Sequence, residues 1–220
     1  MGSHVRFGRD YDFHEILADG IVHGVGVVLA LVGVTALIFH ATLWGSTGAL
    51  VAAWIYGAGL IGALAISFTY NMLPPSRLKW TLRRLDHSAI FILIAATYTA
   101  FLHPGLAQPL ILWLLVGIWV MAGIGVALKC ALPGRYDRAA ILLYLLMGWS
   151  GVVALGPITA SLPPVSVVLV VAGGVIYSVG VIFHVWQRLR FQNAIWHGFV
   201  VTAAAAHYIA VLTAFRQAAI

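Results

Sequence analysis

Charged side chains are scarce in this sequence. Only 8% of its 220 residues are charged, whereas 62% are hydrophobic, and the mean hydropathy is +1.01. Soluble domains carry about 25% charged residues, because their surfaces must stay hydrated. This scarcity excludes an ordinary soluble protein and predicts an integral membrane protein.

Cysteine and lysine are also rare, and each shortage excludes a class of protein. A single cysteine, Cys130, allows neither an internal disulfide framework nor a thiolate cluster around zinc. The only lysines are Lys79 and Lys129, and neither lies in the last apolar segment, where a retinal protein would need one for its Schiff base. The residues up to Glu15 lack the short apolar core of a secretory signal peptide, which favours a protein that stays in the membrane.

Apolar runs long enough to cross a bilayer recur along the chain. About 20 apolar residues cross a hydrocarbon core of about 30 Å, and turn-forming stretches such as PPSR at 74 and HPG at 103 separate the runs. The pattern predicts an all-α, polytopic seven-transmembrane helix bundle that forms a single domain over residues 1–220, with residues 1–16 as a cytoplasmic segment. The predicted spans are 17–40, 48–71, 86–102, 109–130, 139–156, 165–187 and 194–215.

Basic residues divide unevenly between the two ends of these spans. Arg216 alone follows the seventh span, while the other eleven of the twelve lie on the opposite side. By the positive-inside rule, the N-terminus is cytoplasmic and the C-terminus is outside. In short loops such residues meet anionic lipid head groups, so nucleic acid is not an expected partner. The eleven are Arg6, Arg9, Arg77, Lys79, Arg83, Arg84, Lys129, Arg135, Arg138, Arg188 and Arg190.

Polar side chains inside the predicted spans gather at one depth, near the cytoplasmic ends of five spans. Several are spaced four residues apart, which places both members on one helix face. Ionisable groups at membrane depth cost several kcal/mol unless they pair, hydrate or bind a metal, so we expect them to face one another in a polar pocket. These residues are Asp19, His23, Ser67, Asn71, Asp86, His87, His184, Asn193 and His197.

Each of these residues also has a purely structural interpretation. Asn and Ser side chains bond across membrane helices, and Asp86 could cap the third span or pair with Arg83 or Arg84. His14 and Glu15 either cover the mouth of the pocket or are solvated. Because five spans contribute at one depth, the layer as a whole favours a site.

Four stretches of the sequence carry a family resemblance: DGIVHGVG at 19, SFTYN at 67, LRRLDHSAIFILIAATYTAF at 82 and NAIWHGFVVTAAAAHY at 193. Together they resemble the bacterial hemolysin III family, a branch of the progestin and adiponectin receptor superfamily that is related to the alkaline ceramidases. The resemblance implies residence in the bacterial cytoplasmic (inner) membrane. It also implies a zinc site near the cytoplasmic leaflet, with one histidine four residues after the second-span serine and two histidines in the seventh span.

This sequence departs from the implied zinc site. Ser67, Asp86 and His197 match the family's pattern, but asparagine stands at two of the ligand positions, Asn71 and Asn193. Asparagine is a poor zinc ligand compared with histidine, so we expect weakened zinc binding. A hydrogen bond between the two amides, or from each to His197, would preserve the pocket without metal. A rearranged zinc site stays open, in which His23, His87 or His184 joins His197 and Asp86.

Three functions remain open. The favoured one is the binding of a membrane lipid or fatty-acyl ligand in the bundle, with a role in membrane homeostasis. The second is zinc-dependent hydrolysis of a lipid amide, in which Asp86 acts as general base or orients the water, Ser67 helps to bind the oxyanion, and metal on His197 activates the water. The third is proton or ion conduction, for which Tyr98, Thr99 and His207 are the few polar groups on the outer side. The oligomeric state cannot be read from the sequence.

Overall fold

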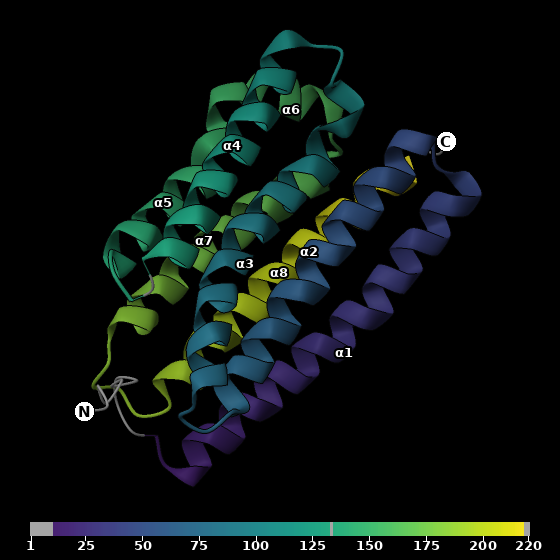
Figure 1. Cartoon of the computed structure of the whole chain (residues 1–220). Coiled ribbons are helices and arrows are strands. Elements are labelled where there is room, and N and C mark those ends of the chain that lie inside the picture. The colour runs from purple at the N-terminus through teal and green to yellow at the C-terminus, as the bar shows by residue number, and fades with distance from the viewer. Residues whose placement is uncertain (1–10, 133, 218–220) are drawn as a thin grey trace.

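The structure of the chain, a computed structural model, describes residues 11–132 and 134–217 (Figure 1). These residues contain seven helical spans long and apolar enough to cross a membrane and no strand, so the predicted seven-helix bundle is confirmed. Arg6 and Arg9 lie outside the described residues. The elements are α1 (Phe13–Trp44), α2 (Thr47–Met72), α3 (Arg77–Leu102), η1 (His103–Gly105), α4 (Pro109–Ala131), α5 (Asp137–Trp149), η2 (Ser150–Ala154), α6 (Leu155–Ser161), α7 (Pro164–Val185) and α8 (Gln192–Gln217).

The first helix begins at a capping box. The Asp12 carboxylate accepts a hydrogen bond from the backbone N–H of Glu15 at 2.9 Å, and the Glu15 carboxylate accepts one from the backbone N–H of Asp12 at 3.1 Å. This reciprocal bonding satisfies backbone donors that the first turn of a helix leaves free. The N–H of Glu15 also lowers the pKa of the Asp12 carboxyl group.

The third helix begins earlier than the sequence predicts. Its N-cap is Ser76, which accepts a hydrogen bond from the backbone N–H of Lys79, so Asp86 lies well inside the helix. The interpretation of Asp86 as an N-cap is therefore wrong. The first turns of α3 are strongly basic, and hydropathy marks only the apolar part of a helix, not the polar turns that precede it.

Six of the spans pack side by side in an open ring, in the order α4, α3, α2, α1, α8 and α7, and α5 closes the ring through sparse contacts with α3, α4 and α7. Small residues allow the closest helix approaches, as is usual in membrane bundles. A Cβ atom at Gly57 of α2 would overlap Val34 of α1. Leu37 of α1 and Ala53 of α2 belong to the same buried cluster, so α1 and α2 form a tightly packed pair.

The fifth span is interrupted near its middle. It runs over residues 137–161 rather than the predicted 139–156, and the 3₁₀ helix η2 separates α5 from α6. Tyr98 of α3 compensates for the break: its Oη donates to the Gly148 carbonyl at 2.9 Å and accepts from the Gly151 N–H at 2.7 Å and from Ser150 Oγ at 3.2 Å. A broken helix is tolerated at membrane depth only where the protein satisfies the freed backbone groups.

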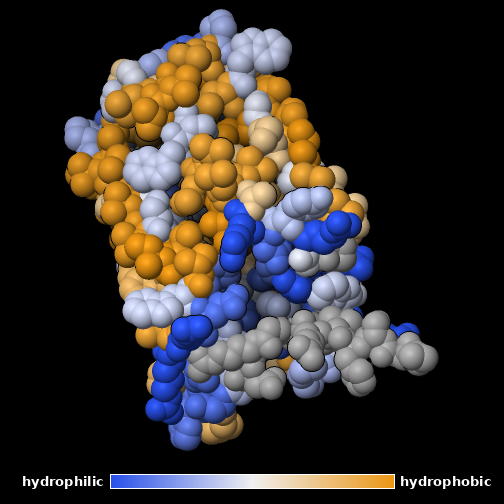
Figure 2. All heavy atoms as spheres, turned by 90° about the vertical axis from the view of Figure 1, so that its left-hand side faces the viewer, coloured by the Kyte–Doolittle hydropathy of each residue, from blue (hydrophilic) through white to orange (hydrophobic). Residues whose placement is uncertain are grey.

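The two ends of the bundle differ in charge. We call the end at which α1, α3, α5 and α8 begin the basic end, because all described basic residues except Arg216 lie at or beside it. Figure 2 shows hydrophilic side chains gathered toward this end and hydrophobic side chains over most of the remaining face. This asymmetry is the one from which the sequence predicts a cytoplasmic basic end.

Candidate functional site

A cavity of about 1410 Å³ lies inside the ring of helices. Its polar end is at the basic end of the bundle, where Figure 2 shows the surface hollowed among hydrophilic side chains. All nine side chains that the sequence assigns to a pocket line this one cavity: Asp19, His23, Ser67, Asn71, Asp86, His87, His184, Asn193 and His197.

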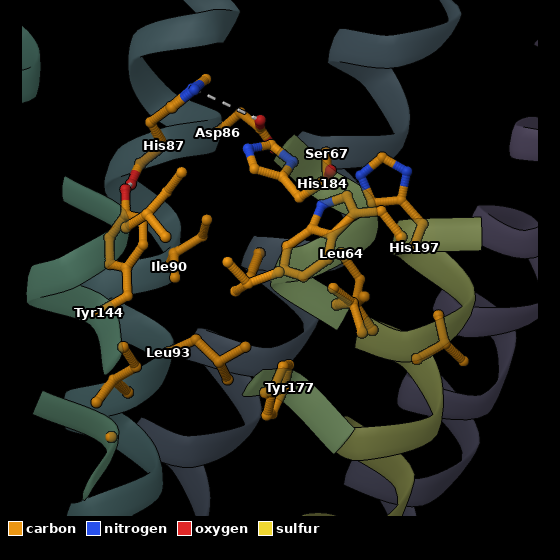
Figure 3. A pocket seen from close by; sticks show the side chains of 18 of the residues that line it. Leu64, Ser67, Asp86, His87, Ile90, Leu93, Tyr144, Tyr177, His184 and His197 are labelled. Carbon is orange, nitrogen blue, oxygen red and sulfur yellow. Dashed lines mark hydrogen bonds and ion pairs between the residues drawn. The ribbon is translucent and has the colours of Figure 1, made fainter. Parts of the chain in front are cut away.

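The remainder of the cavity is apolar. Figure 3 shows Leu64, Ile90, Leu93 and Tyr177 among the side chains that line it beside the histidines. The lining continues to Leu162 near the opposite end of the bundle. Small-molecule pockets usually measure about 300–1,000 Å³, so the cavity is larger than most. Its shape and chemistry combine a polar end with a long apolar interior.

On one wall of the cavity, Asp19 joins two histidines. Its Oδ1 lies 2.6 Å from Nδ1 of His197 and 3.4 Å from Nδ1 of His23, and its backbone carbonyl lies 2.9 Å from Nδ1 of His23. All three residues are buried: Asp19 is 3% exposed, His197 is 8% exposed and His23 is 1% exposed. The carboxylate and the carbonyl accept hydrogen bonds, so each imidazole carries its proton on Nδ1 and leaves Nε2 as an acceptor when it is neutral.

The same wall continues from His23 into α2 and α8. His23 Nε2 lies 3.2 Å from Oγ of Ser67. Asn71 Nδ2 donates to the Ser67 carbonyl at 2.9 Å, and Asn193 Nδ2 donates to Asn71 Oδ1 at 3.2 Å. The hydrogen bond expected between the two amides is therefore present. We call this chain of bonded side chains the α1–α2–α8 network; it contains Asp19, His23, Ser67, Asn71, Asn193 and His197.

Two residues beside this network, Tyr11 and Gln192, were not assigned to the site from the sequence, and a third, Glu15, was assigned either to the mouth of the pocket or to solvent. Tyr11 Oη donates to Gln192 Oε1 at 3.1 Å and to Asn193 Oδ1 at 3.3 Å. Glu15 is buried and accepts a hydrogen bond from the backbone N–H of Phe191 at 3.0 Å, whereas His14 is exposed. The spacing of Glu15, Asp19 and His23, each four residues from the next, places all three on one face of α1, and Glu15 lines the cavity rather than being solvated.

The opposite wall, on α3, α5 and α7, is connected differently. Asp86 Oδ2 lies 3.8 Å from Nδ1 of His87, and that nitrogen also lies 2.8 Å from the Arg83 carbonyl. Nδ1 of His184 is buried without a hydrogen-bond partner among the described residues, although its ring lies 4.9 Å from that of Trp196. Within the described chain, no hydrogen bond links Asp86 to Ser67 or His197. Figure 3 shows Asp86 and His184 facing the cavity beside Ser67 and His197.

Basic side chains surround the polar end of the cavity. Arg83 and Lys129 bind the Asp137 carboxylate at 2.8 Å and 2.6 Å, so the suggested pair between Arg83 and Asp86 is wrong. Arg138 and Arg188 also line the cavity, and neither makes a hydrogen bond or ion pair with another described residue. Two guanidinium groups at the mouth of the cavity are therefore available to a ligand, beside a lining that also contains the carboxylates of Glu15, Asp19, Asp86 and Asp137.

The zinc site implied by the resemblance does not fit these side chains. At the family's three ligand positions, Asn71 and Asn193 are bonded to each other through their amides, and only His197 offers an imidazole. Asp19, His23 and His197 bring ligand atoms within 4.8 Å of one another, but their internal hydrogen bonds already engage Asp19 Oδ1, His197 Nδ1 and both nitrogens of His23. These bonds leave Nε2 of His197 and Oδ2 of Asp19 as the remaining ligand atoms of the three residues.

The fold and the cavity define a class: a seven-helix integral membrane protein with a polar-ended internal cavity. The profile of the family described as Haemolysin-III related matches residues 11–208, and the chain belongs to this family. It is 38% identical to Hemolysin-3 of Bacillus cereus over 198 residues, which cover 90% of each chain. It is 36% identical to a Hemolysin-3 homolog of Bacillus subtilis (strain 168) over 202 residues, 92% of this chain and 95% of the relative.

A more distant likeness extends to animals. The chain is 31% identical to the monocyte to macrophage differentiation factor of Homo sapiens over 206 residues, which cover 90% of this chain and 83% of that protein. The family resemblance read from the four sequence stretches is thus confirmed. Membership in this family and the seven spans are consistent with a bacterial inner membrane as the location.

Proposed function

We propose that this protein binds a membrane lipid, with an acyl chain inside the bundle and the head group at the basic end. The observation that carries the proposal is the cavity of about 1410 Å³, polar at one end and apolar along the rest. An acyl chain is already in an apolar medium in the bilayer, so the apolar lining accommodates it through van der Waals packing, and contacts with the head group at the polar end add the preference for the cavity.

Two arginines at the mouth of the cavity support an anionic head group. Arg138 and Arg188 line the mouth, and each basic residue near a membrane surface contributes about 1 kcal/mol toward anionic lipid. A free fatty acid and an anionic phospholipid share this negative charge next to an acyl chain. Mass spectrometry of the ligand distinguishes them.

Lipid retention by the purified protein tests this proposal. The protein is extracted in mild detergent, and bound lipid per chain is measured by mass spectrometry. We expect about one tightly held lipid, strongly reduced in Leu93→Trp, because the larger side chain would occupy the cavity that Leu93 lines. Leu29→Trp is the matched control, since Leu29 is 55% exposed on the outer surface and its replacement should leave retention unchanged.

Charge substitution provides a second arm of the same experiment. Arg138→Gln and Arg188→Gln should each weaken retention of anionic lipid about fivefold, as the loss of about 1 kcal/mol predicts. Absence of lipid from folded wild-type protein would contradict the proposal. Equal retention by the wild type and Leu93→Trp would also contradict it, because the bound lipid would then lie outside the cavity.

A further inference from the structure

A hydroxyl, an imidazole and a carboxylate follow one another in the cavity wall: Ser67 contacts His23, and His23 contacts Asp19. His23 Nε2 lies 3.2 Å from Ser67 Oγ, and His23 Nδ1 lies 3.4 Å from Asp19 Oδ1 and 2.9 Å from the Asp19 carbonyl. Because a carbonyl only accepts hydrogen bonds, the proton of a neutral His23 is on Nδ1. The lone pair of Nε2 then faces the Ser67 hydroxyl, which is the geometry of a serine activated by a general base.

Other serines of the bundle are bonded in a different way. Ser166 Oγ donates to the Ala210 carbonyl at 2.8 Å, and Ser178 Oγ donates to the Gly174 carbonyl at 2.7 Å. These are the structural bonds usual for serine in membrane helices. Ser67 instead meets an imidazole nitrogen, and both residues line the cavity. Ser67 is therefore placed where a ligand in the cavity can reach an activated hydroxyl.

The depth of Ser67 matches a particular part of a lipid. Ser67 precedes the last residue of α2, Met72, by five positions, which is about 7.5 Å at 1.5 Å per residue. The head-group region on one side of a bilayer is about 5–8 Å thick. A lipid with its head group at the basic end would thus present the linkage between head group and acyl chain near Ser67.

We infer that Ser67 is the nucleophile of an acyl-transfer site, that His23 is its general base, and that Asp19 positions His23. The substrate class is a membrane lipid in which a fatty acid is linked by an ester to an anionic head group. This inference rests on the proposed function, because it requires the lipid to occupy the cavity. It assigns chemistry to residues of the chain itself and needs no metal.

The reaction proceeds in two balanced steps. In the first, Ser67 Oγ forms a bond to the ester carbonyl carbon, its proton passes to His23 Nε2, the bond from carbon to the alcohol oxygen breaks, and His23 returns the proton to that oxygen. In the second, water attacks the acyl-serine, its proton passes through His23 to Ser67 Oγ, and the fatty acid leaves. One water is consumed, and one alcohol and one acid are formed.

Two neighbours suit supporting roles in this reaction. Asn71 Nδ2 lies 3.4 Å from Ser67 Oγ and is a donor beside the place where negative charge develops on the attacked carbonyl oxygen. His197 donates to Asp19 Oδ1 at 2.6 Å, so the carboxylate that holds His23 is itself fixed in place. Asp19 acts through its bond to His23 and is therefore a positioning residue.

Labelling with a long-chain alkyl fluorophosphonate tests the inference on the intact protein in detergent. An activated serine forms an Oγ–P bond with this probe and releases fluoride. We expect one adduct per chain, located on Ser67 by peptide mapping of the wild type, so this result does not depend on the folding of a variant. Ser67→Ala should lose the adduct, and His23→Gln should slow labelling about 100-fold or more.

Matched variants separate chemistry from folding. Ser88→Ala is the control, because Ser88 is buried on α3 and bonds to Cys130 Sγ at 3.9 Å outside the cavity lining; its labelling should equal that of the wild type. Asp19→Asn should slow labelling, and Asp19→Glu should restore part of the rate. A purely structural role of Asp19 would make the labelling rate follow thermal stability, whichever residue replaces it.

The outcomes also separate this inference from the proposed function. Folded protein that retains lipid but acquires no adduct, or acquires it on another residue, overturns the nucleophile assignment and leaves lipid binding intact. An adduct on Ser67 in protein that retains no lipid supports the nucleophile but overturns lipid as its substrate. Phospholipid vesicles provide the final check: released fatty acid that disappears in Ser67→Ala supports the ester chemistry, and no release from labelled protein contradicts it.

Discussion

The two walls of the cavity carry similar side chains at similar depth, but these side chains are bonded in different ways. On the α1–α2–α8 wall, Asp19, His23 and Ser67 form a continuous hydrogen-bonded chain. On the opposite wall, Asp86 has a single 3.8 Å contact with His87, and His184 Nδ1 has no partner among the described residues.

This difference in hydrogen bonding shows that polar side chains at one depth do not by themselves define a site. A buried network in which every member is bonded holds its side chains in one arrangement, and such an arrangement is a precondition for activating a hydroxyl. A buried group without a partner costs free energy instead. We therefore expect the two walls to respond differently to substitution.

Restoring the two missing histidines should change the α1–α2–α8 wall most. Asn71→His together with Asn193→His places three imidazoles beside one another, because the two amides are already in contact at 3.2 Å and His197 lies one turn after Asn193. We expect about one zinc per chain in the double variant and much less than one in the wild type. Metal content of protein purified without chelator measures this difference.

The control for that experiment adds His197→Ala to the double variant and should remove the zinc. One zinc per wild-type chain, lost in His197→Ala, would contradict the expectation. It would mean that Asp19, His23 and His197, whose ligand atoms lie within 4.8 Å of one another, hold the metal in a rearranged site.

Removing the central carboxylate should destabilise the fold. Asp19→Ala leaves the buried imidazole N–H of His197 without its acceptor, which costs about 1–3 kcal/mol. At about 2–4 °C per kcal/mol for a chain of this size, Tm in detergent should fall by several degrees. Asp86→Ala is the matched change on the opposite wall and should lower Tm less. Equal decreases would show that the two walls do not differ in this way.

Crowding the α1–α2 interface at Gly57 should lower the stability by a similar amount. Gly57→Leu places side-chain atoms where Val34 lies. A Cβ atom added at Gly62 of the same helix would have no described atom of another element within 4 Å. Overpacking typically costs about 1–3 kcal/mol. We expect a lower Tm for Gly57→Leu and an almost unchanged Tm for Gly62→Leu. A similar Tm for both variants would argue against the close α1–α2 contact.

The smallest effect is expected at the unpartnered histidine. His184→Leu removes a buried nitrogen that makes no hydrogen bond with a described residue, so Tm should change by less than about 2 °C or rise slightly. His197→Leu, in contrast, breaks the 2.6 Å bond to Asp19 and should lower Tm. Thermal unfolding of the two variants side by side measures the contrast. A large decrease in Tm for His184→Leu would contradict this expectation and would show that His184 makes a stabilising contact.

Much of the fold could be predicted because membrane helices follow hydropathy and length. The predicted seven spans all correspond to observed helices. The start of α3 at Arg77 could not be predicted from hydropathy, because the first turns of this helix are basic rather than apolar. The interruption at η2 could not be predicted from the sequence of the fifth span, because the hydrogen bonds that stabilise it come from Tyr98, a residue of another helix.

The site was predictable in depth but not in connectivity. Spacings of four residues identified the helix faces and the end of the bundle at which Asp19, Asn71 and His197 lie. They could not show which residues face one another across the cavity, because that depends on how each helix is rotated about its axis, and packing against neighbours sets the rotation. For this reason Asp86 was considered as the general base, whereas the structure joins Asp19 to both histidines.

The interrupted fifth span has a consequence for how the chain enters the membrane. Neither α5, with 13 residues, nor α6, with 7, is long enough to cross a bilayer alone. Lipid cannot satisfy the backbone groups that η2 leaves free, whereas Tyr98 of α3 can. During synthesis, α3 is made first and already carries this partner. The fifth span can therefore settle stably in the bilayer only after it has docked on α3, which makes its insertion a step of assembly rather than an independent event.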